Sequence, residues 1–307
     1  MRATGWSPIS LPASTRSSTS ESLQSRGLRL RGLVGVVHPF PSVLDAVAAT
    51  AIALVAGGAT GVAVRLGVGM LCLQFAIGSA NDYMDAASDA VAKPGKPIPA
   101  GRVSVRAALL ISAVTAVAGL MVAASVAPVA LGVAACGLGL GLAYDTRLKG
   151  TPASWAAFAL GVGLLPLYAW IGARGTVPSG LAGVVVMAVV AGSALAIANA
   201  YADVEADRLS GTESVATLIG PTTALRIDAF LLAVVQAIVL ATTVAVGAGP
   251  VLWAEAMGCA LAWLGVALAV THGRRAGALV WEIQALGILV LGAGWLAALS
   301  SAGLLAG

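Results

Sequence analysis

Charged residues are scarce in this chain. Lys, Arg, Asp and Glu together make up 10% of its 307 residues, whereas a soluble domain carries roughly a quarter. Aromatic residues reach only 5%, and the mean hydropathy is +0.96. This composition excludes a soluble globular protein. The apolar residues are mostly Ala, Val, Leu and Gly, and such small residues allow helices to pack closely within a bilayer.

Cysteine and clustered positive charge are also lacking. The three cysteines, Cys72, Cys136 and Cys259, lie in apolar runs without CxxC or Cys–His spacing, so neither a zinc site nor a disulfide framework is expected. The 17 Lys and Arg outnumber the 13 Asp and Glu. They do not form a single patch with aromatic residues, so no nucleic-acid partner is expected.

Nine apolar segments are compatible with the roughly 20 residues that a helix needs to cross a bilayer. They span approximately 42–58, 62–82, 104–125, 127–144, 153–172, 180–201, 224–246, 250–270 and 279–301. The sequence therefore predicts an all-α polytopic membrane protein in which residues 38–307 form a bundle of nine transmembrane helices. Residues 1–37 are rich in Ser and Arg and lack the apolar core of a secretory signal. We expect a disordered basic tail there, with a transit peptide or an over-extended start as alternatives.

An acidic motif ends the second apolar segment. Asp82, Asp85 and Asp89 are three of the chain's 13 acidic residues, and they fall within eight positions. On a continuous helix, Asn81, Asp85 and Asp89 would share one face. Carboxylates that close repel one another unless a cation lies between them, and Mg²⁺ prefers such oxygen ligands together with substrate phosphates. The motif predicts a site for a magnesium-bound diphosphate.

The same spacing returns at the end of the sixth apolar segment. Asn199, Asp203 and Asp207 repeat the interval of Asn81, Asp85 and Asp89. A single acidic helix end is often a solvated cap, but two with the same register favour a shared function. We expect all five motif aspartates to bind Mg²⁺. Four of them are also expected to be catalytic, namely Asp82, Asp85, Asp203 and Asp207.

The basic residues predict the topology. If the N-terminus lies inside, all of the 17 Lys and Arg except Arg65 and Arg174 fall on the inner side, as the positive-inside rule requires. This topology places both acidic motifs on the cytoplasmic face. We expect a multi-pass protein of the cell (plasma) membrane rather than an organelle membrane. The long loops after the second and sixth helices are expected to be cytoplasmic caps over a cavity between the helices.

Several residues beside the motifs have suitable chemistry for a diphosphate. Lys96, Arg147 and Lys149 are expected to donate to phosphate oxygens, although positive-inside topology also explains basic residues there. If the diphosphate is allylic, its departure leaves a carbocation. Aromatic rings would stabilise this cation, and Tyr83, Tyr144 and Tyr201 lie at the right helix ends, where they equally fit a membrane-interface belt.

Five other ionisable residues lie near cytoplasmic helix ends. His38 and His272 show no partner pattern, and no role is expected for either. Asp45, Asp228 and Glu282 lie just inside such ends, where ionisable residues are functional candidates, with capping or snorkelling as the alternative explanation. Glu282 is the candidate general base for an acceptor.

Together these residues resemble the UbiA superfamily of intramembrane prenyltransferases. The family motif NDxxDxxxD is matched from Asn81 to Asp89, and DxxxD is matched by Asp203 and Asp207. The basic-Pro-Ile-Pro-(Ser/Ala)-Gly continuation appears as residues 96–101, and the Tyr-Leu-Lys-Pro segment as residues 144–152. The resemblance extends from about His38 to the ninth apolar segment.

The resemblance implies Mg²⁺-dependent transfer of a prenyl group from a prenyl diphosphate to a lipophilic acceptor of aromatic or polyol type. It also implies that the diphosphate is held by Asn81, Lys96, Tyr144, Arg147 and Lys149, to which the repeated spacing adds Asn199. Two positions depart from the family pattern: His38 and Lys96 each replace a commoner Arg.

A terpene cyclase of the same superfamily, which acts on the diphosphate alone, and a non-catalytic carrier of prenyl lipids are alternative functions. A carrier would be expected to have lost motif aspartates. The acceptor, which ranges over glycerolipid, chlorophyll and quinone precursors, stays open, as do the prenyl chain length and the oligomeric state.

Overall fold

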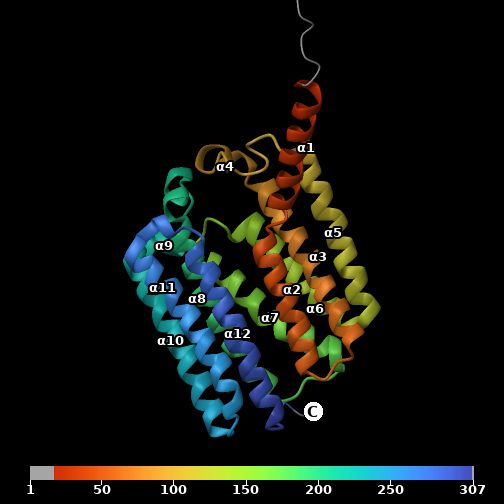
Figure 1. Ribbon diagram of the computed structural model, residues 1–307, viewed down its shortest axis with the longest axis vertical. Helices are drawn as coiled ribbons and strands as arrows, with labels where there is room; N and C mark the ends of the chain where they lie inside the picture. Colours follow the sequence, from red (N-terminus) through yellow and green to blue (C-terminus); the bar gives the residue numbers. More distant parts are fainter. Residues whose placement is uncertain (1–16, 306–307) are drawn as a thin grey trace, which may run out of the picture.

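The computed structural model describes residues 17–305, which form a bundle of long helices aligned along one axis (Figure 1). No strand occurs within these residues. The long helices are α1 (Ser17–Val36), α2 (Pro39–Val55), α3 (Thr60–Met84), α5 (Val105–Val126), α6 (Pro128–Ala143), α7 (Ser154–Arg174), α8 (Leu181–Ser210), α10 (Pro221–Ala245), α11 (Leu252–His272) and α12 (Leu279–Ser301). Two short helices, α4 (Ala86–Ala92) and α9 (Val215–Ile219), lie in the connections after α3 and α8.

The expected membrane crossings are present. Among the described residues, eight helices are long and apolar enough to cross a membrane, and a ninth crossing results if Gly27–Val36 and Pro39–Val55, which meet at a bend of 52°, count as one. Every expected segment from 42–58 to 279–301 coincides with one of the helices α2, α3, α5–α8 and α10–α12. The chain is therefore an all-α polytopic membrane protein, as predicted.

Local sequence sets the helix boundaries. Pro39, Pro128 and Pro221 each lie in the first turn of a helix, where the fixed φ of proline suits a helix start and its missing N–H is not needed. Ser104 caps α5, since its Oγ accepts a hydrogen bond from the Ala107 amide at 3.1 Å. These signals explain why most observed ends lie within a few residues of the hydropathy boundaries, whereas α8 continues to Ser210, well past the expected end at 201.

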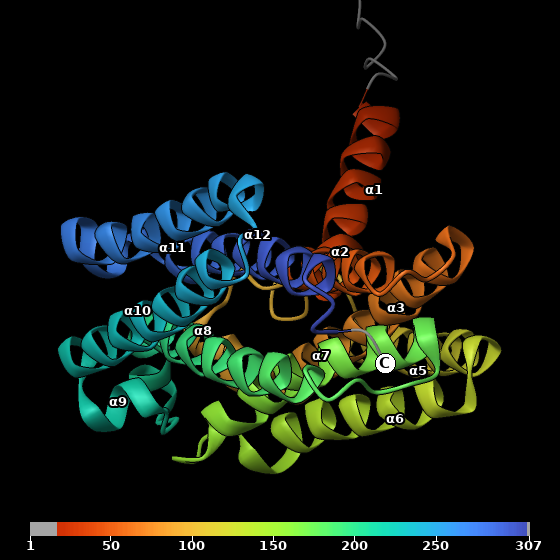
Figure 2. The ribbon, with the colours of Figure 1, turned by 90° about the horizontal axis from the view of Figure 1, so that it is seen from below.

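Small residues bring the helices into close contact. A Cβ atom added at Gly258 in α11 would lie 2.7 Å from the Gly287 carbonyl oxygen of α12, and one at Gly287 would lie 2.6 Å from the Gly258 oxygen. Glycine at both positions therefore allows the two backbones to touch. Seen along the bundle, α12 lies beside α2, and α7 and α8 pass through the middle of the assembly (Figure 2).

The expected disordered tail is wrong for residues 17–36, which form α1; residues 1–16 lie outside the described residues. The end of α1 packs on the loop after α4. Val36 is fully buried, and a Cβ at Gly32 would lie 2.7 Å from Arg102 Cβ. Burial against this loop accounts for the order of the last turn of α1, where composition alone indicated a solvated tail.

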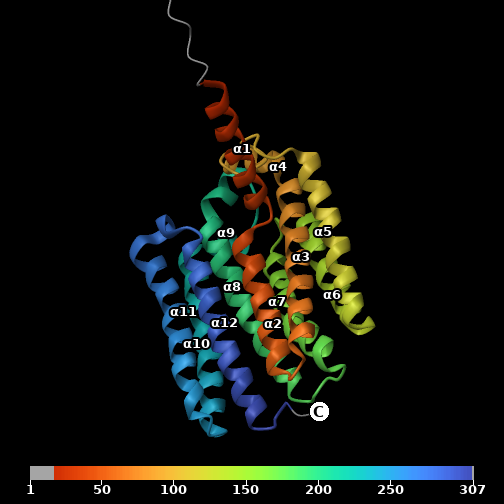
Figure 3. The same cartoon turned by 45° about the vertical axis from the view of Figure 1, so that its right-hand side comes forward.

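The connections after α3 and α8 lie at the same end of the bundle as α1, whereas the C-terminus lies at the opposite end (Figures 1 and 3). Both connections are partly helical, through α4 and α9. Residues from both line the cavity described below. Their role as cytoplasmic caps stays a prediction.

Candidate functional site

A cavity of about 700 Å³ lies inside the bundle, from the end that carries α4 and α9 down between α2, α3, α6, α7 and α8. Carboxylates and lysines line it at that end, and apolar side chains line it further in. Four of the five motif aspartates, Asp85, Asp89, Asp203 and Asp207, line the cavity. The structure thus brings the two acidic motifs, more than a hundred residues apart in sequence, to one chamber. We call this polar end the acidic chamber.

The first motif is divided between two helices. Helix α3 ends at Met84 and α4 begins at Ala86, with Asp85 between them, so one continuous helix was the wrong expectation. The Asp85 amide still bonds to the Asn81 oxygen at 2.9 Å, and the Asp89 amide to the Asp85 oxygen at 2.8 Å. These hydrogen bonds preserve the helical phase, and Asn81, Asp85 and Asp89 all line the cavity. Asp82 does not line it and is only 2% exposed, but its partners His38 and Lys96 both do.

The second motif lies on the uninterrupted helix α8. Asn199, Asp203 and Asp207 are each one turn apart on it, and all three line the cavity. Helix α8 ends at Ser210, and Gly211 follows it with a φ of 68°, a conformation that glycine adopts without strain. The chain then turns back, and Thr212, Ser214 and Val215 also line the cavity.

Lysines neutralise these aspartates. Lys93, which follows α4, donates from Nζ to Asp203 Oδ1 at 2.8 Å and so connects the two motifs. Lys149 pairs in the same way with Asp85. Each pair joins segments far apart in sequence, so the chamber alternates positive and negative groups and is not a uniform acidic surface.

Lys96 pairs with two carboxylates of the first motif. Its Nζ lies 2.9 Å from Asp82 Oδ1 and 2.8 Å from Asp89 Oδ2. Burial disfavours the charged ammonium, but the carboxylates of Asp82 and Asp89 outweigh burial and raise the pKa of Lys96 above its ordinary value. Lys96 is thus positively charged, as its expected role as a donor to phosphate oxygens requires.

His38 has a partner, contrary to expectation. Its Nε2 lies 3.0 Å from Asp82 Oδ1, and the residue has a φ of 49° at the start of α2. This left-handed backbone is unusual for a side-chain-bearing residue, and it lets His38 pack against Gly78 of α3. Asp82 Oδ1 thus receives His38 and Lys96 together, whereas Asp82 Oδ2 is buried with no hydrogen-bond partner among the described residues.

The turn after α6 contributes a carboxylate that sequence reasoning missed. Residues Tyr144–Leu148 form one π-helical turn, and within it Asp145 is buried at 8% exposure. The Asn81 amide nitrogen donates to Asp145 Oδ1 at 2.8 Å, so Asn81 connects the first motif to this turn. A carboxylate at the end of an apolar run, beside Tyr144, was the signal available.

The remaining expected site residues are distributed unequally. Tyr144 and Lys149 line the cavity, whereas Arg147 is exposed and does not. Tyr201 is buried instead, and its hydroxyl donates to the Ala269 oxygen at 3.3 Å. Glu282, the candidate general base, does not line the cavity either.

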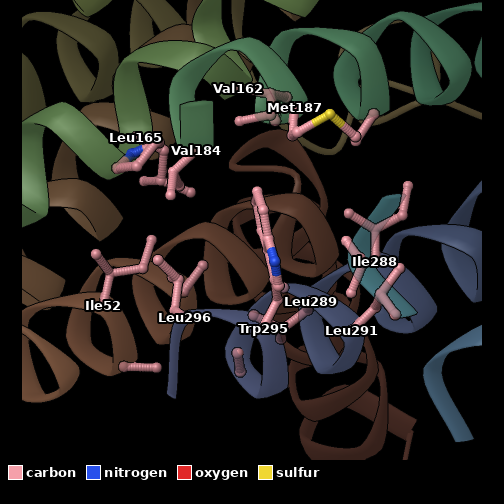
Figure 4. A pocket seen from close by; sticks show the side chains of 18 of the residues that line it. Ile52, Val162, Leu165, Val184, Met187, Ile288, Leu289, Leu291, Trp295 and Leu296 are labelled. Atoms are coloured by element: carbon pink, nitrogen blue, oxygen red, sulfur yellow. The ribbon is translucent and has the colours of Figure 1, made fainter. Parts of the chain in front are cut away.

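A second, fully apolar pocket of about 130 Å³ lies deeper in the bundle (Figure 4). Side chains of α2, α7, α8, α10 and α12 surround it, among them Ile52, Met187 and Trp295. Val162 and Leu165 line both this pocket and the larger cavity. These two apolar side chains therefore lie between the larger cavity and the deeper pocket.

The acidic chamber fits magnesium by the chemistry of its donors. Its carboxylate oxygens are the ligands that Mg²⁺ prefers, and the buried Asp82 Oδ2 lacks any other partner in the described part of the chain. Across residues 17–305, no three His, Cys, Asp or Glu side chains come close enough to hold one metal ion by themselves. This arrangement agrees with a metal held by one or two carboxylates, waters and a phosphate, not by a protein cage.

Fold and site together define a class: a polytopic helical membrane protein with a charged chamber at one end and an apolar interior. The family model described as the UbiA prenyltransferase family matches residues 43–282. The chain belongs to this family, which confirms the resemblance and the expectation of a prenyltransferase.

Two relatives are named digeranylgeranylglyceryl phosphate synthase. The one from Methanoregula boonei is 33% identical over 198 residues, covering 62% of this chain and 69% of its own. The one from Halobacterium salinarum is 36% identical over 205 residues, covering 65% and 73%.

Two solved structures share the fold. A UbiA homolog from Aeropyrum pernix has a TM-score of 0.69 at 20% identity, covering 82% of this chain and 96% of its own. One from Archaeoglobus fulgidus, bound to GPP and Mg²⁺, has a TM-score of 0.60 at 18% identity, covering 69% and 78%.

Proposed function

We propose that the chain transfers a prenyl group from a prenyl diphosphate to a lipophilic hydroxyl acceptor inside the membrane, with Mg²⁺ as its cofactor. The observation that carries the proposal is one cavity with two aspartate motifs at one end and apolar walls beyond them. A diphosphate requires cationic partners, and its hydrocarbon chain requires an apolar surface. The Archaeoglobus fulgidus homolog bound to GPP and Mg²⁺ supports this assignment.

We assign metal binding to the five motif aspartates, Asp82, Asp85, Asp89, Asp203 and Asp207. Magnesium, when bound, supplies positive charge against the diphosphate as negative charge grows on the leaving oxygen. Asp203 and Asp207 would contribute from α8, and Asp85 and Asp89 from the α3–α4 break. Four of these residues, all but Asp89, are the proposed catalytic set.

Lysines of the chamber would change partners when a diphosphate binds. In the structure Lys93, Lys96 and Lys149 each neutralise a motif aspartate. With phosphate oxygens in the chamber, their ammonium groups donate to the ligand and release the carboxylates. The amides of Asn81 and Asn199, which also line the cavity, are positioned to bind the same diphosphate.

The allylic cation left after diphosphate departure would lie below the acidic chamber. Tyr144 lines the cavity there, and its ring face would stabilise a positive charge. The prenyl chain extends along the apolar wall towards Val162 and Leu165, beyond which the deeper pocket continues (Figure 4).

The relatives guide the choice of acceptor. Their name describes a glyceryl phosphate that bears two geranylgeranyl groups, so the last such group is attached to a hydroxyl of a glyceryl phosphate. We place the acceptor of this chain in the same class, a glycerophosphate lipid with one free hydroxyl, and the donor as geranylgeranyl diphosphate. We place the acidic chamber on the cytoplasmic face of the cell membrane, a topology that the basic loops support.

The test is transfer by detergent-purified protein with Mg²⁺ and radiolabelled geranylgeranyl diphosphate. The acceptor panel contains geranylgeranylglyceryl phosphate, a quinone precursor and a porphyrinoid, and the Asp85→Ala and Asp203→Ala variants serve as controls. We expect diphosphate release that requires the glycerophosphate acceptor and is lost in both variants.

Other outcomes would replace the proposal. Release without acceptor, yielding a cyclic hydrocarbon, would identify a cyclase. Folded protein that binds the donor and never releases diphosphate would identify a prenyl-lipid carrier. Transfer to the quinone precursor or the porphyrinoid alone would refute the glycerophosphate assignment.

A further inference from the structure

A polar pair lies within the apolar part of the cavity. Asp45 of α2 accepts a hydrogen bond at Oδ2 from Gln74 Nε2 of α3, at 2.5 Å. Both residues line the cavity, among apolar neighbours such as Met70, Leu73 and Ile77. A carboxylate in a membrane-spanning helix is costly, and it usually marks a functional site.

The pair leaves two oxygens open to the cavity. Within the described part of the chain, Asp45 Oδ1 makes no hydrogen bond, and neither does Gln74 Oε1. Neither oxygen is among the buried atoms that lack a partner, and both residues line the cavity. A ligand in the cavity therefore meets two hydrogen-bond acceptors at this point, one of which belongs to a carboxylate.

The pair lies at a defined depth below the acidic chamber. Asp45 follows His38 by seven residues on α2, and Gln74 precedes Asn81 by seven on α3. Seven residues advance a helix by about 10 Å. A donor whose diphosphate lies among the motif aspartates would extend its prenyl group from the acidic chamber towards this depth.

A second Asp–Gln pair provides a contrast within the same molecule. Gln284 Nε2 of α12 donates to Asp228 Oδ2 of α10 at 2.8 Å. Both residues are 0% exposed, and neither lines a cavity described above. This pair ties two helices together, whereas the chemically identical pair of Asp45 and Gln74 faces an open space.

We propose that Asp45, held by Gln74, binds the acceptor hydroxyl and takes its proton; this inference rests on the proposed function. The acceptor oxygen forms a bond to the first carbon of the prenyl group. The bond from that carbon to the diphosphate breaks, and the diphosphate leaves with the electron pair. The hydroxyl proton passes to Asp45 Oδ1. An anionic phosphate on the acceptor is repelled by Asp45 and lies towards the lysines of the acidic chamber.

The first test measures single-turnover transfer to geranylgeranylglyceryl phosphate. Asp45→Asn keeps the side-chain shape but removes the proton acceptor, and we expect the transfer rate to fall about 100-fold, as for loss of a general base. The dissociation constant of geranylgeranyl thiodiphosphate should change less than about twofold. The transfer rate of Asp45→Glu should be at least about tenfold higher than that of Asp45→Asn. The matched control Asp228→Asn should transfer within about threefold of the wild-type rate.

The second test does not depend on turnover. It measures binding of a 1-O-alkylglycerol 3-phosphate and of its 2-deoxy analogue, which lacks the hydroxyl. Wild type should prefer the hydroxylated probe by about tenfold or more, because a site that hydrogen-bonds a hydroxyl rejects the analogue without it. Asp45→Leu should bind both probes equally.

The outcomes separate the two proposals. If wild type transfers and Asp45→Asn matches it, or if Asp228→Asn loses as much rate, the role of Asp45 is refuted. If wild type transfers to no glycerophosphate, the proposed function fails. The binding test with the two probes still tests the role of Asp45, because equal binding of both probes by wild type would refute the inference.

Discussion

Lys96 offers a direct test of the idea that lysines stand in for a metal in the acidic chamber. Its ammonium lies between the carboxylates of Asp82 and Asp89, at 2.9 and 2.8 Å. Lys96→Met keeps the chain length and removes the charge. The two carboxylates then face each other at about 5 Å, where an effective dielectric constant of about 20 gives a repulsion of about 3 kcal/mol.

This repulsion should appear as a loss of thermal stability without metal. At about 2 °C per kcal/mol for a chain of this size, Lys96→Met should melt about 6 °C below wild type in EDTA, as followed by tryptophan fluorescence in detergent. Mg²⁺ with geranylgeranyl thiodiphosphate should reduce this difference in melting temperature to less than half, because the cation replaces the missing ammonium. Lys96→Arg, which keeps the charge, is the control and should melt within about 2 °C of wild type.

Two results would refute this reasoning. If Lys96→Met and wild type melt at the same temperature in EDTA, the pairing of Lys96 with Asp82 and Asp89 contributes nothing to stability. If the difference in melting temperature is the same with Mg²⁺ and the thiodiphosphate as in EDTA, the ligand does not enter the space between these carboxylates.

Three further predictions concern neighbouring parts of the cavity. Lys149→Met should lower the transfer rate about 100-fold, whereas Arg147→Met should leave it within about threefold, because only the first of the two lines the cavity; equal losses would contradict the geometry. Ala191→Phe places a ring in the apolar pocket of about 130 Å³ and should reduce kcat/KM for geranylgeranyl diphosphate but not for geranyl diphosphate; an equal loss for both would show that the chain does not reach the pocket. His38→Gly removes the hydrogen bond to the α3 carboxylate and relieves a left-handed backbone worth about 1 kcal/mol. Donor affinity should therefore fall about tenfold with little change in melting temperature, and unchanged affinity would assign no role to the imidazole.

The membrane bundle could be predicted from the sequence because bilayer crossing depends on local composition. About 20 apolar residues between Gly, Pro and charged punctuation determine a crossing helix regardless of its neighbours. The repeated spacing of Asn81 and Asn199 with their aspartates identified both acidic motifs that line the chamber, for the same reason. Each motif is local, and helix periodicity fixes which side chains share a face.

The pairings within the chamber depend on tertiary structure, so local sequence patterns do not predict them. Lys149 pairs with Asp85, 64 positions earlier. His38, which pairs with Asp82, has a left-handed backbone between α1 and α2. Arg147 and Lys149 looked equivalent in sequence, but the π-helical turn leaves Arg147 exposed. No periodicity rule predicts such a turn, nor the break at Asp85.

The central claim is that both aspartate motifs hold one diphosphate through magnesium. The most direct measurement is a structure of the protein with Mn²⁺ in place of Mg²⁺ and geranylgeranyl thiodiphosphate, with the metal located by its anomalous signal. The account predicts metal between the α3–α4 break and α8, with Lys93 and Lys96 moved onto phosphate oxygens and the chain running past Val162. Metal and diphosphate bound outside this chamber, with both lysines still paired to aspartates, would contradict it.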